Sequence, residues 1–441
     1  MPKTKRSNRD HAHQHQCPSP DNQVIAAELE ALLTPALYAQ QVYFRSLELR
    51  ERVLNLPLML AAVITMLWRQ VPSVNELTRM LAREDLLWCK AVKVSQQAVS
   101  QRFLSFPSVL FERVFFELLP QLRQRWQQRH KRPLASSVQF ATQQFEQIWI
   151  ADSSTLEALF RKLSSLQDQP IGTLAGKMAT VVDLVTRLPV HIWFEENPRA
   201  NDVHFEDDLL RVLDAKTLLI IDRGFYHFQF WSQLIEAHVD FISRLKAGAS
   251  YRVEQVFTNS QQVIDQLIVL GVKRKNAPQL RLRLVQVRFG STWYSYLTSV
   301  IDPHQLPPFA VADLYRRRWR IEEAFYIVKR LLGLSYLWTG SLNGIKLQIW
   351  ATWLFYAVLV DLGDAIADEI GVPFDHISLE MLYRGLYHFS VAYNQAKATH
   401  PVSYFAAQEN QDLRVVKTRK PEPTLDLSPF PKPYLTFLSS S

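Results

Sequence analysis

The chain has 441 residues, a length that suits two or three domains of ordinary size, one of which can hold a large core. Hydrophobic residues make up 48% of the sequence and charged residues 21%, close to the average of soluble globular proteins, which excludes a largely disordered or fibrous chain. The 50 Lys and Arg residues exceed the 42 Asp and Glu residues, and the resulting net charge of +8 favours a polyanionic partner.

The first segment, residues 1–23, is predicted to be a disordered basic arm. It is polar and has no apolar stretch of the kind that marks a signal peptide, so we do not expect export. Three alternating histidines in this arm are interpreted as solvated side chains and not as metal ligands. The two cysteines are too few for a disulfide framework or a cysteine zinc site, which fits a reducing, intracellular setting.

Residues 24–135 are expected to form an all-helical domain that binds DNA. Apolar residues recur there at helical spacing, without the alternation typical of strands. Ser73 and Glu76 have the spacing of a capping box, and Ser95 can cap a following helix with the sequence SQQAVSQRFL. Two short helices joined by a link resemble a helix-turn-helix arrangement.

The second of these helices has one apolar and one polar face. It is expected to bury Ala98, Val99 and Phe103. Its outward side chains include Gln97, Gln101 and Arg102, which can reach phosphates or base edges. An ordinary amphipathic surface helix has the same pattern, so this alternative stays open.

From residue 146 the pattern changes to short apolar strands that alternate with helices, which indicates an α/β sheet. EQIWIAD is predicted to be a strand ending at Asp152, and KMATVVDLVTRLPVHIWFEE to be two strands joined by a turn near Thr186 and Arg187. NDVHFEDDLLRVL is predicted to be a helix. TLLIID reads as a strand buried on both faces that ends at Asp222.

The stretch of about 249–300 alternates apolar and polar residues and is predicted to be a β-rich insertion. It carries a basic cluster that we count among the candidate DNA contacts: Lys273, Arg274 and Lys275.

After Pro307 a long helix is predicted, FAVADLYRRRWRIEEAFYIVKRLLG, with Gly333 as its stop. The apolar runs 56–68 and 347–360 are shorter than the roughly 20 residues of a spanning helix, so we expect buried core helices and no membrane contact. Residues 361–441 are expected to be a helical C-terminal region with a Pro-rich tail.

One stripe of the long helix carries an unusual set of polar side chains. Tyr315, Arg318, Glu322 and Lys329 fall at about 0°, −60°, −20° and −40° around the helix axis. A helix that only packs against a core does not show a hydroxyl, a guanidinium, a carboxylate and an ammonium on one stripe. The two cations suit phosphate contacts, and the carboxylate suits a metal ion.

A hard divalent cation needs more oxygen ligands than Glu322 alone, and Asp152 and Asp222 can supply them from the carboxyl ends of strands. Two ions about 4 Å apart, bridged by such carboxylates, can activate a water or 3′-hydroxyl and stabilise the leaving oxygen. Each acid also has an ordinary interpretation: an Asp at a strand end is a common turn residue, and Glu322 can pair with Arg318.

The pattern Y-x(2)-R-x(3)-E-x(6)-K is met without departure by Tyr315, Arg318, Glu322 and Lys329. It is the signature of insertion-sequence DDE transposases of the IS-four, Tn-five-like type, and the chain resembles that family. The segment ADSSTLEALFRKL at Asp152 resembles the first catalytic segment of that family, NPRANDVHFEDDLL resembles the helix that follows it, and LLIIDRGFYHF resembles the segment that carries the second Asp. The resemblance covers approximately residues 146–360, which we take as the catalytic core.

The resemblance implies a ribonuclease H-like mixed-sheet core with a β-rich insertion between Asp222 and Glu322. It implies Mg²⁺ or Mn²⁺, two ions per active site, held by Asp152, Asp222 and Glu322. It implies double-stranded DNA as partner, at transposon ends and target, and a homodimer in the synaptic complex. A prokaryotic, cytoplasmic protein associated with the nucleoid is expected.

The family also implies DNA contacts near the cleaved end for Tyr315, Arg318 and Lys329. An aromatic residue of the insertion can stack on a flipped base, and Trp293 is the candidate, although it can instead be a core residue of its strand.

Three functions are compatible with these residues. The first is a transposase that cleaves terminal inverted repeats and transfers the 3′-hydroxyl to target DNA, and the second is a nuclease that cuts without strand transfer. The third is an inactive or domesticated relative that binds ends or inhibits transposition. All three carboxylates are present, which favours the first.

Overall fold

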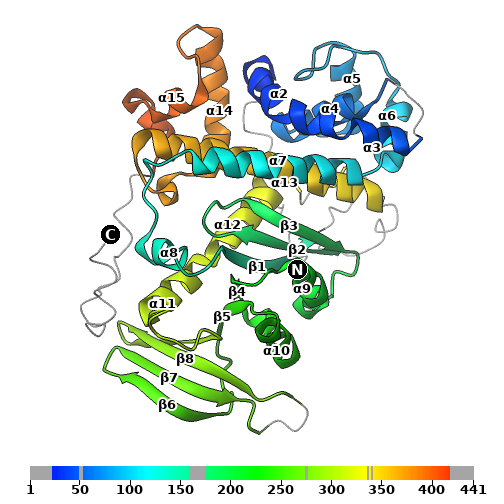
Figure 1. Ribbon diagram of the computed structural model, residues 1–441. Helices are drawn as coiled ribbons and strands as arrows, with labels where there is room; N and C mark the ends of the chain where they lie inside the picture. The colour runs from blue at the N-terminus through cyan, green and yellow to red at the C-terminus, as the bar shows by residue number, and fades with distance from the viewer. Residues whose placement is uncertain are drawn as a thin grey trace, which may run out of the picture. The chain divides into compact units, whose positions relative to one another are not determined.

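The computed structural model describes residues 22–48, 53–157, 174–273, 277–334, 337–338 and 341–417, which divide into two compact units (Figure 1). The first unit takes the described residues within 1–133, 156–175 and 324–418, and the second takes those within 134–155 and 176–323. The first unit thus groups N-terminal helices with helices after residue 324, whereas the sequence predicted separate domains. Nearly all of the predicted arm, and the Pro-rich tail, lie outside the described residues.

The first unit is built from helices, as the sequence predicted for its N-terminal part. Ser73 and Ser95 cap α5 and α6 as expected: their hydroxyls accept hydrogen bonds from the backbone N–H groups of Glu76 and Ala98, at 3.2 and 3.1 Å. The helices of this unit are α2 (Asn22–Ala39), α3 (Gln41–Ser46), α4 (Leu56–Trp68), α5 (Val74–Leu81), α6 (Gln96–Ser105), α7 (Val109–Gln127), α13 (Leu342–Ile370), α14 (Leu379–Asn394) and α15 (Pro401–Ala406).

Helix α13 is longer than the apolar run 347–360 suggested. It begins after Ser341, whose hydroxyl accepts a hydrogen bond from the backbone N–H of Gly344, and ends at Gly371 in the left-handed conformation (φ +67°). With 29 residues and a mean hydropathy of 1.4 in an 18-residue window, α13 is long and apolar enough to cross a membrane. The prediction that this helix is too short to span a membrane was therefore wrong. However, 83% of that window is buried inside the structure, which is how a core helix behaves.

The second unit is organised around one mixed sheet of nine strands in the order β3-β2-β1-β4-β5-β9-β8-β7-β6. Strands β1, β4 and β5 run parallel. The pairs β2–β3, β5–β9, β6–β7, β7–β8 and β8–β9 are antiparallel. The strands are β1 (Gln147–Glu157), β2 (Leu174–Asp183), β3 (Pro189–Glu195), β4 (Thr217–Ile221), β5 (Asp240–Arg244), β6 (Tyr251–Asn259), β7 (Val263–Leu270), β8 (Leu280–Phe289) and β9 (Thr292–Thr298).

The predicted β-rich insertion is present, and it extends the same sheet. Its four strands, β6 to β9, join the parallel strands through the antiparallel pair β5–β9. The predicted turn between β2 and β3 is also found, with Arg187 in the left-handed region (φ +60°).

Short helices precede, connect and follow these strands. The predicted helix NDVHFEDDLLRVL is a 3-10 turn, η2 (Asp202–Phe205), followed by α9 (Glu206–Val212). The others are α8 (Ser136–Ala141), η3 (Arg223–Phe225), α10 (Phe228–Glu236), α11 (Pro308–Arg317) and α12 (Trp319–Tyr326). The boundary between the two units falls inside α12, after Glu323.

The core of the second unit lies on strand β4, whose five residues are all buried, as expected for a strand covered on both faces. Trp231 of α10 stacks on Phe241 of β5 with ring centroids 5.0 Å apart. These contacts hold β4 and β5 in the core, and one of the predicted acids, Asp222, directly follows β4.

A fully buried ion pair ties the β-rich part to the segment before α11. Arg283 of β8 donates to both carboxylate oxygens of Asp265 on β7, at 2.7 and 2.8 Å. The Nη1 group of Arg283 donates to the carbonyl oxygen of Leu306 at 2.7 Å, and Leu306 lies two residues before α11. The pair therefore anchors the start of the helix that leads to Arg318 and Glu322.

Candidate active site

Asp152 and Asp222 come directly after the paired stretch of two neighbouring parallel strands, β1 and β4, at the same level. The register of β1 and β4 runs from Gln147 opposite Thr217 to Ala151 opposite Ile221, and each aspartate is the next residue. Adjacent strands lie about 4.8 Å apart, so the two carboxylates share one end of the sheet. Strand β1 continues to Glu157, so Asp152 ends the pairing with β4 and not the strand itself.

The carboxylate of Asp152 is nearly enclosed, with its side chain 14% exposed. Its Oδ1 atom accepts a hydrogen bond from the backbone N–H of Ser153 at 2.8 Å. Its pKa is raised from 3.8 to about 7, chiefly by burial. The guanidinium of Arg318 opposes this increase, and the charges of Asp222 and Asp202 add to it. Without a further cation, this carboxyl group therefore titrates near neutral pH.

Asp222 starts the turn after β4. Its Oδ1 atom accepts a hydrogen bond from the backbone N–H of Gly224 at 2.6 Å, which caps η3. A Cβ atom at position 224 would lie 1.8 Å from Oδ2 of Asp202 and 2.8 Å from Oδ1 of Asp222, so only glycine fits this turn without displacement.

The helix with the four-residue stripe is less regular than predicted. Helix α11 ends at Arg317, α12 follows at Trp319, and a π-helical turn occupies Ile327–Leu331. The π turn changes the angle per residue before Lys329, so the 100° spacing no longer applies there. Lys329 also belongs to the first unit, and its place beside the three acids stays a prediction.

Arg318 joins two of the predicted catalytic acids. Its Nη1 group binds Oδ2 of Asp152 at 2.7 Å, and its Nη2 group binds Oε1 of Glu322 at 2.9 Å. The i, i+4 pair considered from the sequence is thus present, and the guanidinium also reaches the sheet. Arg318 is 8% exposed and its carbon Cζ lies 5.9 Å from the ring centre of Tyr315, which is also 8% exposed. Burial raises the pKa of Tyr315.

The donors at this site suit a divalent cation, since carboxylate oxygens are the ligands that Mg²⁺ and Mn²⁺ prefer. Among the described residues, no three His, Cys, Asp or Glu side chains are gathered as a ready metal-binding group. Arg318 separates Asp152 from Glu322, whose side chain is 37% exposed, so shared coordination requires the guanidinium to shift. The chemistry of the donors fits the ion.

The sequence reasoning missed two groups, an ion pair beside the aspartates and an indole beside Arg318. Asp202 of η2 forms an ion pair with Lys177 of β2, with 2.7 Å between Nζ and Oδ1, and accepts a hydrogen bond from the hydroxyl of Ser153. These residues lie far apart along the chain and share no spacing that could have revealed them. The other group is the indole of Trp319, 62% exposed and adjacent to Arg318.

The proposed DNA-reading face of α6 is partly corrected. Gln97 and Gln101 are exposed, as predicted. Arg102 is buried at 8% exposure, where its Nε group donates to the carbonyl oxygen of Leu54 at 3.2 Å, and Ala98 is exposed. The buried stripe of α6 therefore runs through Val99, Arg102 and Phe103, because a long arginine side chain can line a core with its carbon stem.

The candidate DNA contacts of the β-rich part include two exposed side chains. Trp293 is 38% exposed on β9, so the alternative that it is a core residue is wrong. Lys273 is exposed, whereas Arg274 and Lys275 lie outside the described residues.

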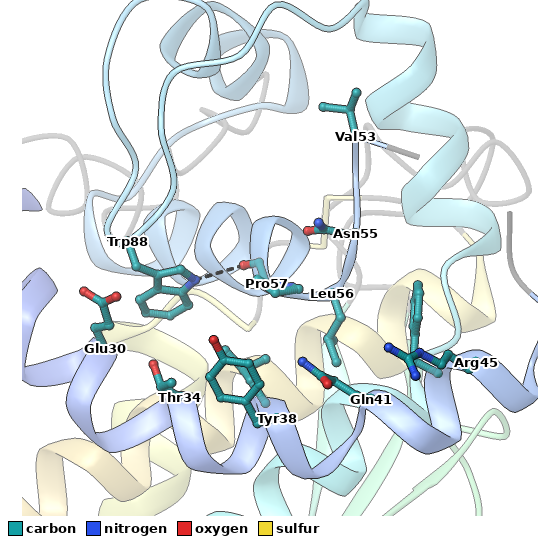
Figure 2. Close-up of a pocket in the computed structure, with 12 residues that line it drawn as sticks. Glu30, Thr34, Tyr38, Gln41, Arg45, Val53, Asn55, Leu56, Pro57 and Trp88 are labelled. Carbon is teal, nitrogen blue, oxygen red and sulfur yellow. Dashed lines mark hydrogen bonds between the residues drawn. The ribbon is translucent and has the colours of Figure 1, made fainter. Parts of the chain in front are cut away.

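A cavity of about 720 Å³ lies in the first unit, between α2, α3 and the start of α4 (Figure 2). Tyr38, Gln41 and Arg45 line one side of it, and Trp88 donates from its indole N–H to the carbonyl oxygen of Pro57 at 3.2 Å. Glu30 is the one acidic side chain among its lining residues, so the cavity lacks the carboxylate set of a metal-dependent site.

Comparison with known proteins finds a transposase domain in the part of the chain that carries the three acids. Residues 143–358 match the model of the family described as Transposase DDE domain. This segment of the chain is therefore a transposase DDE domain. The narrower assignment to the IS-four, Tn-five-like type stays a prediction. Asp152, Asp222 and Glu322 all lie within the matched segment, and such families generally use divalent metal ions.

Two curated relatives carry names of the same kind. A Sinorhizobium fredii protein named as a transposase is 28% identical over 156 residues, 33% of this chain and 43% of that protein. A Geobacillus stearothermophilus protein, named as a transposase for insertion sequence element IS5377, is 24% identical over 173 residues, 38% of this chain and 45% of that protein. The chain therefore spans less than half the length of these relatives.

Among solved structures, the cryo-EM structure of the piggyBac transposase synaptic complex with hairpin DNA covers 92% of this chain and 86% of its own. Its sequence identity is 10% and its TM-score is 0.37, a likeness too low to carry an argument about the fold.

Proposed function

We propose that this DDE transposase cleaves DNA at the terminal inverted repeats of a transposon and joins the 3′-hydroxyl to target DNA. Asp152, Asp222 and Glu322 are proposed as ligands of two Mg²⁺ or Mn²⁺ ions. The observation that supports the proposal most is the register of β1 and β4, in which the two aspartates are the next residues after the last pair. In addition, Arg318 links Glu322 to Asp152.

The ions, when bound, would polarise the scissile phosphate and activate the attacking oxygen. Asp152 would bind as a carboxylate, because an added cation offsets the burial and the neighbouring charges that raise its pKa. Asp222 would present its second oxygen while Oδ1 holds the turn through Gly224. Glu322 would bind an ion from helix α12 once the guanidinium of Arg318 moves away from its carboxylate.

Arg318 is proposed to exchange its carboxylate partners for a DNA phosphate near the cleaved end. Its Nε–H group is buried and has no hydrogen-bond partner within the described part of the chain, which leaves one donor for a phosphate oxygen. Tyr315 and Lys329 are proposed to contact DNA nearby, and the exposed Trp293 to stack on a flipped base.

A ribonuclease H-like core is proposed for the second unit. The support is the strand order β3-β2-β1-β4-β5, with an antiparallel β2–β3 pair beside parallel β1, β4 and β5. Gln97, Gln101 and Lys273 are proposed DNA contacts because they are exposed polar side chains. We further propose a homodimer that holds two ends in a synaptic complex, and a cytoplasmic setting at the nucleoid.

The test is cleavage of DNA that carries the inverted repeats flanking the gene, with Mg²⁺ or Mn²⁺. Glu322→Gln is expected to abolish cleavage while binding of the ends stays nearly unchanged. Glu323→Gln is the matched control, since that side chain is 52% exposed and pairs with Arg320. Cleavage by Glu322→Gln at the parent rate would refute the assignment. A strand-transfer product from a pre-cleaved end distinguishes a transposase from a nuclease.

A further inference from the structure

A fourth carboxylate, that of Asp202, connects the two segments that carry the catalytic aspartates. Its Oδ1 atom accepts a hydrogen bond from the hydroxyl of Ser153, the residue after Asp152. Its Oδ2 atom lies against Gly224, two residues after Asp222, where any Cβ atom would come within 1.8 Å of it. The carboxylate therefore fills the space between the two segments.

Lys177 fixes this carboxylate from strand β2. Its Nζ group lies 2.7 Å from Oδ1 of Asp202 and also donates to the carbonyl oxygen of Ala200 at 2.7 Å. The side chains of Lys177 and Asp202 are only 14% and 17% exposed, so solvent screens this pair less than a surface pair. Removing either partner leaves the other charge poorly solvated and free to move.

A second link ties the same chain segments together. The buried carboxylate of Glu206, at the start of α9, binds Nδ1 of His227 at 2.7 Å, just after η3. The turn after Asp222 is thus fixed at two points by residues 202–206, at Gly224 by contact and at His227 by a hydrogen bond. A turn fixed at two points has little freedom to rotate.

We propose that Asp202 is a positioning residue of the phosphoryl-transfer site and that Lys177 holds it in place, an inference that rests on the function proposed above. Asp202 sets the separation of the Asp152 and Asp222 carboxylates, on which shared binding of a divalent ion depends. Lys177 and Ser153 engage the Oδ1 atom of Asp202, and its Oδ2 atom lies against Gly224. Both oxygens are therefore taken up by the protein, and Asp202 is assigned a supporting role and not that of a ligand.

The test measures Mn²⁺ binding to the full chain by calorimetry, with Mn²⁺ alone as the probe. Asp202→Ala and Lys177→Met are expected to raise the Kd for Mn²⁺ by about 10- to 100-fold, the usual effect of removing a support behind metal ligands. Asp208→Asn is the matched control, an aspartate of α9 paired at 2.9 Å with the exposed Arg211, and its Kd should not change.

Cleavage provides a second reading. The Mn²⁺ concentration for half-maximal cleavage is expected to rise by the same factor in Asp202→Ala and Lys177→Met, while binding of transposon ends stays constant. A merely structural role would lower the melting temperature of the metal-free chain without moving this concentration. If Asp202→Ala fails to fold, Asp202→Asn takes its place, because it keeps the size of the side chain and an acceptor for the hydroxyl of Ser153. A Kd for Mn²⁺ above that of the parent chain then supports the inference, and a parent-like Kd overturns it.

The outcomes separate the inference from the proposed function. Parent-like Mn²⁺ affinity in the folded variants, with cleavage intact, overturns the role of Asp202 and leaves the transposase proposal standing. Absence of Mn²⁺ binding by the parent chain would remove the proposed function, and the inference with it.

Discussion

Replacing Asp152 by Asn is expected to stabilise the metal-free chain at pH 8 and to leave its stability unchanged near pH 4. The carboxylate is nearly enclosed and lies close to the charges of Asp222 and Asp202, with Arg318 as its opposing charge. An amide of the same size removes the buried negative charge while filling the same space. The site is therefore less stable than it could be, which is common where a protein binds a cation.

The magnitude follows from the pKa of Asp152, which the folded chain raises from 3.8 to about 7. The difference is about 3 pH units, each worth about 1.4 kcal/mol, so the upper bound is about 4 kcal/mol. Between about pH 4 and pH 7 the folded chain keeps a proton that the unfolded chain has lost. The stability of the parent chain therefore falls as the pH rises through this window, and levels off above it.

The assay is urea unfolding of both chains in EDTA at several values of pH. The free energy of unfolding of Asp152→Asn should exceed that of the parent by an amount that grows from pH 4 to pH 7. Added Mg²⁺ should stabilise the parent chain more than the variant, because the ion binds the carboxylate. A variant that is less stable than the parent at pH 8 in EDTA, or a difference independent of pH, would refute the reasoning.

Three further predictions concern other parts of the chain. Asp265→Ala should lower the free energy of unfolding by about 3–5 kcal/mol, because it leaves Arg283 buried without its partner. Replacing both partners, Asp265 by Leu and Arg283 by Met, should cost far less. Equal losses of the two variants in urea unfolding would contradict this. Ser95→Ala should cost about 1 kcal/mol through the lost cap of α6, and an unchanged urea midpoint would argue against that cap. Trp293→Ala should hardly change the melting temperature, since the ring is 38% exposed, but should weaken binding of transposon ends; parent-like end affinity would remove its proposed stacking role.

The strands and the helix that carry the three proposed acids follow from local patterns in the sequence. An apolar run of four residues, 218–221, before Asp222 predicts a buried strand, and parallel pairing then brings Asp222 level with Asp152. Helical periodicity likewise places Arg318 and Glu322 on one side of their helix. The π-helical turn before Lys329 follows no such pattern, and the prediction for that residue weakened there.

Contacts between distant segments could not be predicted in the same way. Asp202 lies 25 residues from Lys177 and 49 from Ser153, and only the folded sheet brings their side chains together. The burial of Arg102 was missed for a related reason, since its partner is the backbone of Leu54, outside helix α6. Periodicity shows which face of a helix is apolar, but not which polar side chains find partners inside.

The shared coordination of divalent ions is tested most directly by anomalous diffraction from crystals of the parent chain soaked in Mn²⁺. The account predicts Mn²⁺ peaks within about 2.0–2.3 Å of carboxylate oxygens of Asp152, Asp222 and Glu322, with the guanidinium of Arg318 displaced from between Asp152 and Glu322. Peaks bound elsewhere, with the Arg318 bridge between Asp152 and Glu322 intact at the same Mn²⁺ concentration that supports cleavage, would contradict it.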